Sequence, residues 1–390
     1  MPSRQPARAT LGSISALASG DATRIDKVAA HQDREQITSG SRLANCTSRR
    51  PNGLMGRAVL AGAGAGDCCE SFRRSAPGDS LGVGTIPTRH RMLLMKRDFL
   101  ALNSLTSDTV TRLLDSAQVF SRAFTDRSMP QLLAGKSVAI WFPDSGFRNR
   151  VAFDLGVQLM GGKVTHVPGE LGEREDPADV GAYLSNWFDA IVVRAPDIAR
   201  VRELARGASI PVINGRTSHN HPCEILGDLA FIQSARGSLS GLQVAFVGPA
   251  GNICHSWFEA SATLPIHVTQ VCPPGFEASE TFLSELRESA AGEMTTTPDI
   301  YGALKHADVI CTDTWPGGIP EIADQFRPYQ ITAEILAPIP QECLFLPCPP
   351  VHRGEEVDAG AMMDPRCRVT QAKAFLLHAQ NALLAELTDA

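Results

Sequence analysis

His221 stands where a predicted strand, residues 211–214, passes through a polar loop into a predicted helix. Pro222 suits the first turn of a helix, because its missing N–H would have no partner there in any case. In open α/β sheets, ligands bind outside the carboxyl ends of the strands, which is where this His would lie. The imidazole is therefore a candidate for binding or polarising a substrate. The alternative is a capped turn in which the His bonds a backbone carbonyl.

Two arginines follow other predicted strands of the same half of the chain. Arg148 lies in the turn after residues 138–142, and Arg194 ends residues 190–194. Because the carboxyl ends of parallel strands meet at one edge of a sheet, we expect both side chains to converge with His221. Guanidinium groups beside a helix N-terminus bind oxyanions such as phosphate. The alternative is that each arginine forms an ordinary surface ion pair.

Three further candidates, Asn252, Asp313 and Cys348, follow predicted strands in the second half of the chain. Asp313 would bind a substrate ammonium group or close an Asx-turn. Asn252 would contact the same substrate or cap the helix that it starts. Cys348 lies between prolines, where a buried and inert thiol is the common case. The turn before Asn252 lacks the GxGxxG spacing, which argues against a dinucleotide site.

From about residue 97 the chain alternates between short apolar strands and amphipathic helices. This alternation predicts an α/β fold of parallel sheets with helices on both faces. The pattern runs twice, so we expect two doubly wound lobes. The predicted strands cover residues 138–142, 163–167, 190–194, 211–214, 243–248, 267–271, 309–312 and 344–346. A long amphipathic helix is predicted over residues 371–387.

The composition excludes several classes of protein. The net charge of −6 argues against a general nucleic-acid or membrane-surface binder. No apolar run approaches the roughly 18–20 residues that a membrane helix needs. The ten cysteines are scattered, which is typical of reduced thiols in a cytoplasmic protein rather than of disulfides or a zinc site.

Residues 1–90 differ from the remainder of the chain. They carry 12 Lys and Arg against 7 Asp and Glu, whereas the remainder carries 24 against 35. They lack sustained periodicity and include a run of alternating Ala and Gly at 61–66. We expect a disordered N-terminal extension. The alternatives are a transit peptide, which would place the protein in the mitochondrial matrix, or a working protein that starts at Met92 or Met95.

Residues 96–387 resemble the aspartate/ornithine carbamoyltransferase family, and more closely its ornithine branch. The resemblance rests on motifs that keep the family's order and spacing. These are Leu-Ala-Gly-Lys-Ser-Val-Ala at 133–139, Arg-Asn-Arg-Val-Ala-Phe-Asp at 148–154, His-Pro-Cys-Glu at 221–224 with Asp228, Asn-Ile-Cys-His-Ser at 252–256, Thr-Asp-Thr-Trp at 312–315 and His-Arg-Gly-Glu-Glu-Val at 352–357.

The resemblance implies four parts of the chain and a homotrimer with active sites at subunit junctions. Residues 1–90 are the extension, and residues 91–229 bind carbamoyl phosphate. Residues 230–365 bind the amino acid, and residues 366–390 form a helix that returns to pack on the first domain. No cofactor and no metal are implied.

The implied activity is transfer of a carbamoyl group from carbamoyl phosphate to the amine of ornithine or an ornithine-like amino acid. Arg148 and Arg194 would hold the phosphate and the carbonyl oxygen, His221 would polarise that carbonyl, and Cys348 would lie beside the acceptor's side chain. The implied carbamoyl-phosphate site comprises Gly146, Phe147, Arg148, Asn149, Arg194, His221 and Glu224. The implied amino-acid site comprises Asn252, Asp313, Gly317 and Gly318.

Several positions depart from the family pattern. Gly-Phe-Arg-Asn-Arg at 146–150 replaces Ser-Thr-Arg-Thr-Arg, and Glu224 replaces Gln. Gly317 and Gly318 replace Ser-Met, and Leu376 stands where an Arg is expected on the last helix. An added carboxylate would favour a more cationic ligand. We therefore predict a divergent carbamoyltransferase, the alternative being a non-catalytic paralogue that binds an amino acid or a partner subunit.

Overall fold

A computed structural model describes residues 97–143, 146–317 and 320–388. The extension predicted over residues 1–90 lies outside the described residues, and so does Gly318. None of the described helices is both long and apolar enough to cross a membrane.

The first lobe is built on a four-stranded parallel sheet in the order β2-β1-β3-β4. Its strands are β1 (Ser137–Trp141), β2 (Lys163–His166), β3 (Ala190–Arg194) and β4 (Val212–Arg216). Every residue of β3 is buried, as expected for a central strand with both faces covered. The carboxyl ends of β1, β3 and β4 meet at one edge, so the loops that follow them can form one site.

Helices cover both faces of this sheet because alternate strand residues point to opposite sides. Ile140 and Val192 pack with the core of α2, α3 and α6, whereas Ile191 and Val193 pack with α4 and α5. The helices of the lobe are α2 (Ser107–Thr125), α3 (Phe147–Leu159), α4 (Pro177–Leu184), α5 (Ile198–Gly207) and α6 (Pro222–Arg236), preceded by the short η1 (Leu102–Ser104).

The second lobe has a five-stranded parallel sheet in the order β7-β6-β5-β8-β9. Its strands are β5 (Gln243–Val247), β6 (His267–Val271), β7 (Glu293–Thr297), β8 (Val309–Thr312) and β9 (Leu344–Pro347). Its helices are α7 (Asn252–Thr263), α8 (Glu280–Arg287), α9 (Ile300–Leu304), α10 (Pro320–Phe326), α11 (Ala333–Leu336) and α12 (Ala359–Met363), with η2 (Arg327–Tyr329). The predicted fold class of two parallel α/β lobes is confirmed.

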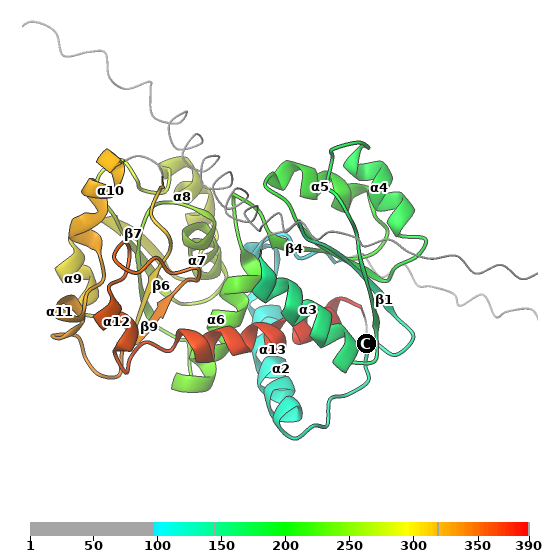
Figure 1. Cartoon of the computed structure of the whole chain (residues 1–390), viewed down its shortest axis with the longest axis horizontal. Coiled ribbons are helices and arrows are strands. Elements are labelled where there is room, and N and C mark those ends of the chain that lie inside the picture. The colour runs from blue at the N-terminus through cyan, green and yellow to red at the C-terminus, as the bar shows by residue number, and fades with distance from the viewer. Residues whose placement is uncertain (1–96, 144–145, 318–319, 389–390) are drawn as a thin grey trace, which may run out of the picture. The chain divides into compact units, whose positions relative to one another are not determined.

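The last helix, α13 (Val369–Leu387), returns to the first lobe as predicted. It lies along α6, α2 and α3, and Figure 1 shows it in red beside them. A Cβ atom at Gly227 of α6 would lie 2.9 Å from Cδ2 of Leu376, so glycine lets these two helices approach closely. Helix α6 also runs through the predicted boundary between residues 229 and 230, and the domain boundaries stay predictions.

Candidate active site

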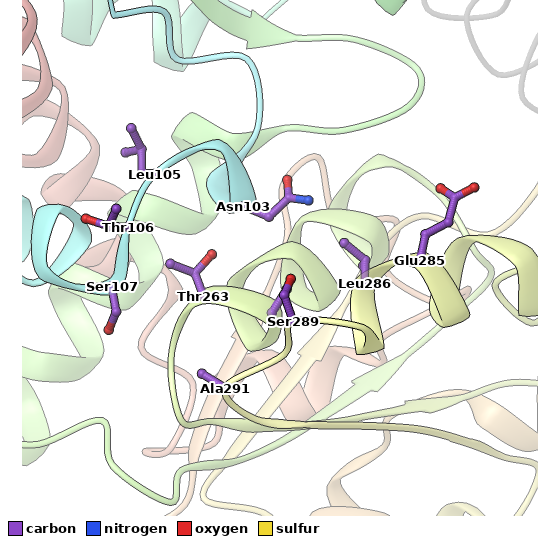
Figure 2. Close-up of a pocket in the computed structure, with 10 residues that line it drawn as sticks. Asn103, Leu105, Thr106, Ser107, Thr263, Glu285, Leu286, Ser289 and Ala291 are labelled. Carbon is purple, nitrogen blue, oxygen red and sulfur yellow. The ribbon is translucent and has the colours of Figure 1, made fainter.

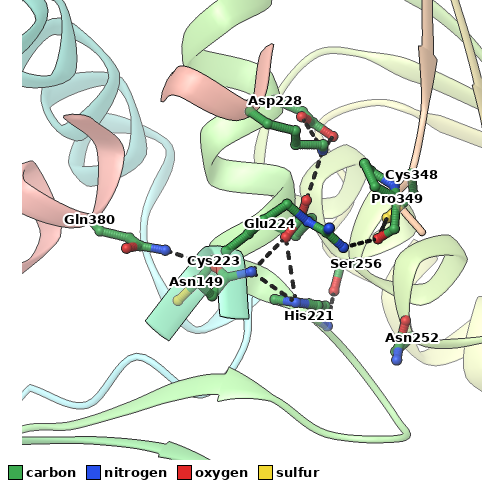
Figure 3. Close-up of polar contacts among 12 residues, drawn as sticks. Asn149, His221, Cys223, Glu224, Asp228, Asn252, Ser256, Cys348, Pro349 and Gln380 are labelled. Carbon is green, nitrogen blue, oxygen red and sulfur yellow. Dashed lines mark hydrogen bonds and ion pairs between the residues drawn. The ribbon is translucent and has the colours of Figure 1, made fainter. Parts of the chain in front are cut away.

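His221 occupies the N-cap position of α6, directly after the loop that follows β4. Its side chain is buried, with 6% exposed, and its backbone N–H donates to Ser256 Oγ at 2.8 Å. The imidazole Nε2 lies 3.4 Å from Asn149 Nδ2 and 3.5 Å from Glu224 Oε2. Figure 3 shows these three side chains directed toward one another. The strand, loop and helix order read from the sequence therefore places the His at the sheet's carboxyl edge.

The His221 imidazole is neutral at physiological pH. Burial lowers its pKa to about 3, and the nearby cations Arg194, Arg216 and Lys373 add to this effect against the opposing charge of Glu224. Its Nδ1 atom is buried and has no hydrogen-bond partner within the described part of the chain. A neutral imidazole donates from one nitrogen and accepts at the other. It can therefore polarise a substrate carbonyl without carrying a full charge.

Asn149 links the start of α3 to the start of α6. Its Nδ2 donates to Glu224 Oε2 at 2.8 Å, and its Oδ1 accepts from Gln380 Nε2 of α13 at 2.7 Å. With 3% exposed, Asn149 is too enclosed to rotate freely. Three helices are thus held together beside His221 by one amide.

Glu224 belongs to a buried group of three charges. Lys373 Nζ lies 2.8 Å from Glu224 Oε1 and 2.7 Å from Asp228 Oδ1, and the Lys373 side chain is 9% exposed. Burial opposes ionisation of Glu224, but Lys373, His221 and Asn149 outweigh it and lower the pKa of this carboxyl. Burial raises the pKa of Asp228, while Lys373 acts in the opposite direction.

The last helix therefore does supply a cation near the site. Leu376, which stands where the family pattern has Arg, packs against Gly227, and Lys373 lies one turn earlier. Lys373 pairs with both Glu224 and Asp228, so this one cation offsets only part of the charge of the two carboxyl groups. The expectation that the added carboxylate favours a more cationic ligand stays a prediction.

Arg194 and Arg148 both lie close to the turn that precedes α3. Arg194 ends β3 and lies so close to Gly146 that a Cβ atom there would be 2.4 Å from Arg194 Nη1. Gly146 has a φ of +80°, so glycine meets both the space and the backbone requirement at this turn. Arg148 stacks over the exposed Phe147 ring at 4.9 Å, and its Nη2 donates to Pro349 O at 2.6 Å. A guanidinium of the first lobe thereby reaches the segment that carries Cys348.

Cys348 follows β9 and is buried. Its backbone N–H donates to Thr312 O at 2.9 Å, which sets it beside the end of β8. Burial, then the charges of Asp313 and Glu224, hold the pKa of this thiol well above its usual range. A protonated thiol is a poor nucleophile, so the burial of Cys348 argues against a role as an attacking group.

Asp313 directly follows β8, and Asn252 is the first residue of α7. Asp313 Oδ1 accepts from the Thr314 backbone N–H at 2.9 Å, and burial raises the pKa of this carboxyl to about 6. Asn252 does not cap α7, because Gly251 holds the N-cap position; its Nδ2 instead donates to Thr217 O at 3.2 Å. Gly317 lies half-buried in the loop before α10.

Comparison with known proteins decides the family. The model of the aspartate/ornithine carbamoyltransferase carbamoyl-P binding domain matches residues 97–234, and that of the Asp/Orn binding domain matches residues 240–387. The chain belongs to the aspartate/ornithine carbamoyltransferase family. The ornithine carbamoyltransferase of Carboxydothermus hydrogenoformans is 36% identical over 299 residues, which cover 74% of this chain and 96% of that protein. That of Anoxybacillus flavithermus is 34% identical over 305 residues, covering 75% and 97%.

Solved structures of the family agree with this fold. The ornithine carbamoyltransferase from Pyrococcus furiosus is 32% identical, with a TM-score of 0.71 over 74% of this chain and 96% of that one. The enzyme from Thermus thermophilus is 29% identical, with a TM-score of 0.67 over 74% and 98%.

Four residues near the family site were missed from the sequence: Arg216, Ser256, Lys373 and Gln380. Arg216 ends β4 as the Cα partner of Arg194, and its positive charge acts on both His221 and Asp313. Polar residues inside the apolar stripe of the last helix were the signal that could have identified Lys373 and Gln380. Ser256 offered no such signal, because its role depends on the contact between two lobes.

A separate cavity of about 360 Å³ lies away from the predicted site residues. It is lined by η1, the start of α2 and the segment from α7 to α8, including Asn103, Thr263 and Glu285 (Figure 2). No predicted carbamoyl-phosphate or amino-acid residue lines it.

Proposed function

We propose that the chain transfers the carbamoyl group of carbamoyl phosphate to the side-chain amine of ornithine or an ornithine-like amino acid. The observation that carries the proposal is the neutral, buried His221 at the N-terminus of α6, where the charge of Arg194 acts on it, with Arg148 donating to the carbonyl of Pro349, the residue after Cys348. Family membership supports the same reaction.

On the donor side, the start of α3 would direct backbone N–H groups toward the anion. The start of α6 offers fewer, because Pro222 has no N–H and the N–H of His221 is bonded to Ser256. Arg148 and Arg194 would neutralise the phosphate, and His221 would donate a hydrogen bond to the carbonyl oxygen. The neutral acceptor amine would attack the carbonyl carbon and form the C–N bond while charge builds on oxygen. The C–O bond to phosphate would then break, and the leaving phosphate would take the proton that the amine nitrogen gives up. Preorganised hydrogen-bond donors and cations that stabilise this developing charge usually make the largest contribution to lowering the barrier of such a reaction.

Glu224 would accept hydrogen bonds from the carbamoyl NH₂ group. Lys373 and Asn149 keep its carboxylate charged and oriented. A carboxylate can only accept, which suits an NH₂ donor as well as the amide of Gln would. The replacement of Gln by Glu is therefore compatible with carbamoyl phosphate.

On the acceptor side, Asp313 would bind the amino acid's ammonium group, and Asn252 its carboxylate. Gly317 and Gly318 would leave more room than the Ser-Met pair of the ornithine branch. We propose that this space sets the choice of acceptor. The protein would act as a homotrimer in the cytoplasm, with sites at subunit junctions.

The test is phosphate release from carbamoyl phosphate by a chain that begins at Met92, with ornithine and a panel of related amines. Turnover with at least one amine, abolished by His221→Ala, is the expected result. Turnover unchanged in His221→Ala would remove the His from the mechanism. No release with any amine, together with no carbamoyl phosphate binding by calorimetry, would favour the non-catalytic paralogue.

A further inference from the structure

Polar side chains on one face of α7, called here the polar stripe, form hydrogen bonds with the loop that leads to His221. Residues 252, 255, 256, 259 and 263 follow the spacing of a single helix face, although this helix is otherwise largely buried. Each of these side chains makes a hydrogen bond to the loop over residues 217–221 or to η1. One helix of the second lobe therefore holds a loop of the first.

The first three residues of the stripe, at positions 252, 255 and 256, form hydrogen bonds with backbone atoms of the loop. Asn252 Nδ2 donates to Thr217 O at 3.2 Å, and His255 Nδ1 lies 2.8 Å from His219 O. Ser256 Oγ accepts from the backbone N–H of His221 itself at 2.8 Å.

Glu259 is buried and accepts hydrogen bonds from both the loop and η1. Its Oε1 accepts from Asn220 Nδ2 at 2.8 Å, and its Oε2 accepts from the Leu102 backbone N–H at 3.2 Å. Asn220 Oδ1 in turn accepts from Asn214 Nδ2 at 2.7 Å and Thr217 Oγ1 at 3.0 Å. Asn220 immediately precedes His221, so this network fixes the residue next to the imidazole.

We propose that Glu259 is a positioning residue that holds His221 in place by clamping Asn220 to α7. The inference rests on the proposed function. Glu259 is 2% exposed and lies outside the residues expected to touch either substrate. Both of its oxygens face N–H donors, and the charged group that acts on it from another helix is Arg202 of α5.

A carboxylate is the group that meets both donors at once. Glutamine has nearly the same shape but offers one oxygen and one NH₂, so one buried donor would face another donor. Leaving a buried polar group unsatisfied is unfavourable, so Glu259→Gln favours a shift of the loop that separates the two donors. A displacement of about 1 Å at a reacting group can lower a rate by about a hundredfold.

The test compares Glu259→Gln with Ser261→Ala. Ser261 lies on the same helix and is buried, but it bonds Ile266 O and Glu293 O inside the second lobe. We expect Glu259→Gln to lower kcat about tenfold or more, with KM for the acceptor changed less than about threefold. Ser261→Ala, although destabilised, should keep kcat within about twofold.

A second readout is independent of turnover. The ¹⁵N imidazole signals of His221, assigned with His221→Ala, should shift in Glu259→Gln and stay in place in Ser261→Ala. If the wild-type protein shows no turnover, the proposed function fails while these signals still test the positioning role. Unchanged signals and unchanged kcat in Glu259→Gln would overturn the inference.

A double variant provides the final test of the contact between Asn220 and Glu259. In the double variant Asn220→Asp with Glu259→Gln, the donor and acceptor exchange places across this contact, but the Asn220→Asp change also removes the bond that Asn220 Nδ2 donates to Leu100 O at 3.0 Å. The single variant Asn220→Asp measures that second loss, and kcat of the double variant should exceed that of Asn220→Asp by about threefold or more. A stably folded double variant no faster than Asn220→Asp would argue against the Asn220 contact. Should Glu259→Gln not fold, Glu259→Asp, which keeps the charge but shortens the side chain, is judged by the same kcat and signal criteria.

Discussion

At the scale of single residues, the buried charges around Lys373 are the feature with the largest expected effect on stability. Lys373 faces Glu224 and Asp228 within 2.9 Å, in a region from which water is nearly excluded. Removing the one cation from such a group leaves buried carboxyl groups without a partner, which is strongly destabilising. The carboxylate that departs from the family pattern is therefore tied to the last helix.

Replacing Lys373 with Met should lower the free energy of unfolding by about 3–5 kcal/mol, because two buried carboxyls lose their cation. Urea unfolding followed by circular dichroism measures the change. Lys163→Met, at an exposed position of β2, is the matched control and should change stability by no more than about 0.5 kcal/mol. Equal midpoints for Lys373→Met and the control would show that the ion group does not support the fold.

Some site residues could be predicted from the sequence, and others could not. His221, Arg148 and Arg194 follow strands, so strand prediction alone places them near one sheet edge. The position of Lys373 within the apolar stripe of α13 marks it as unusual, but its pairing with Asp228, 145 positions earlier in the chain, depends on how α13 packs on α6. The contact of Ser256 with His221 likewise depends on how two lobes meet.

At the scale of elements, apolar strands were predicted well. All eight predicted strands are present, and their ends differ by two residues or fewer. The strand missed was β7, whose sequence Glu-Met-Thr-Thr-Thr is polar and sits at the edge of its sheet. Edge strands do not need two apolar faces, so hydrophobic runs do not reveal them. The short helices α9 to α12 were missed because a few residues carry no clear period.

Helix α13 also carries a buried His that should make stability depend on pH. His378 lies between Phe124 and Phe375, with ring centroids 5.6 and 5.4 Å away, and burial lowers its pKa to about 4. Between pH 6.5 and 4 the unfolded chain therefore binds a proton that the folded chain does not. The stability associated with this group is lost as pH falls through that window.

His378→Phe should remove this loss. The wild-type protein should lose about 2 kcal/mol more than the variant between pH 7 and pH 5. Urea midpoints of both proteins at the two pH values supply the comparison, and other titrating groups cancel in the difference. Parallel pH profiles for the two proteins would contradict the role given to His378.

At the scale of the whole molecule, two parallel α/β lobes and a returning helix were predictable because the buried strands and the longer helices have distinct hydrophobic periods. The trimer is a prediction from family resemblance. Sedimentation equilibrium of a chain beginning at Met92 should give three times the chain mass, unchanged on dilution into the low micromolar range. A monomer at every concentration tested would rule out sites shared between subunits of this chain.

The proposed reaction requires one anion to be held by groups that end or follow three neighbouring strands, β1, β3 and β4. A crystal structure with carbamoyl phosphate bound tests this most directly. We predict that Arg148, Arg194 and His221 each lie within hydrogen-bond distance of the ligand, about 2.7–3.2 Å between heavy atoms. A ligand bound elsewhere, or one that any of the three side chains fails to reach, would contradict it.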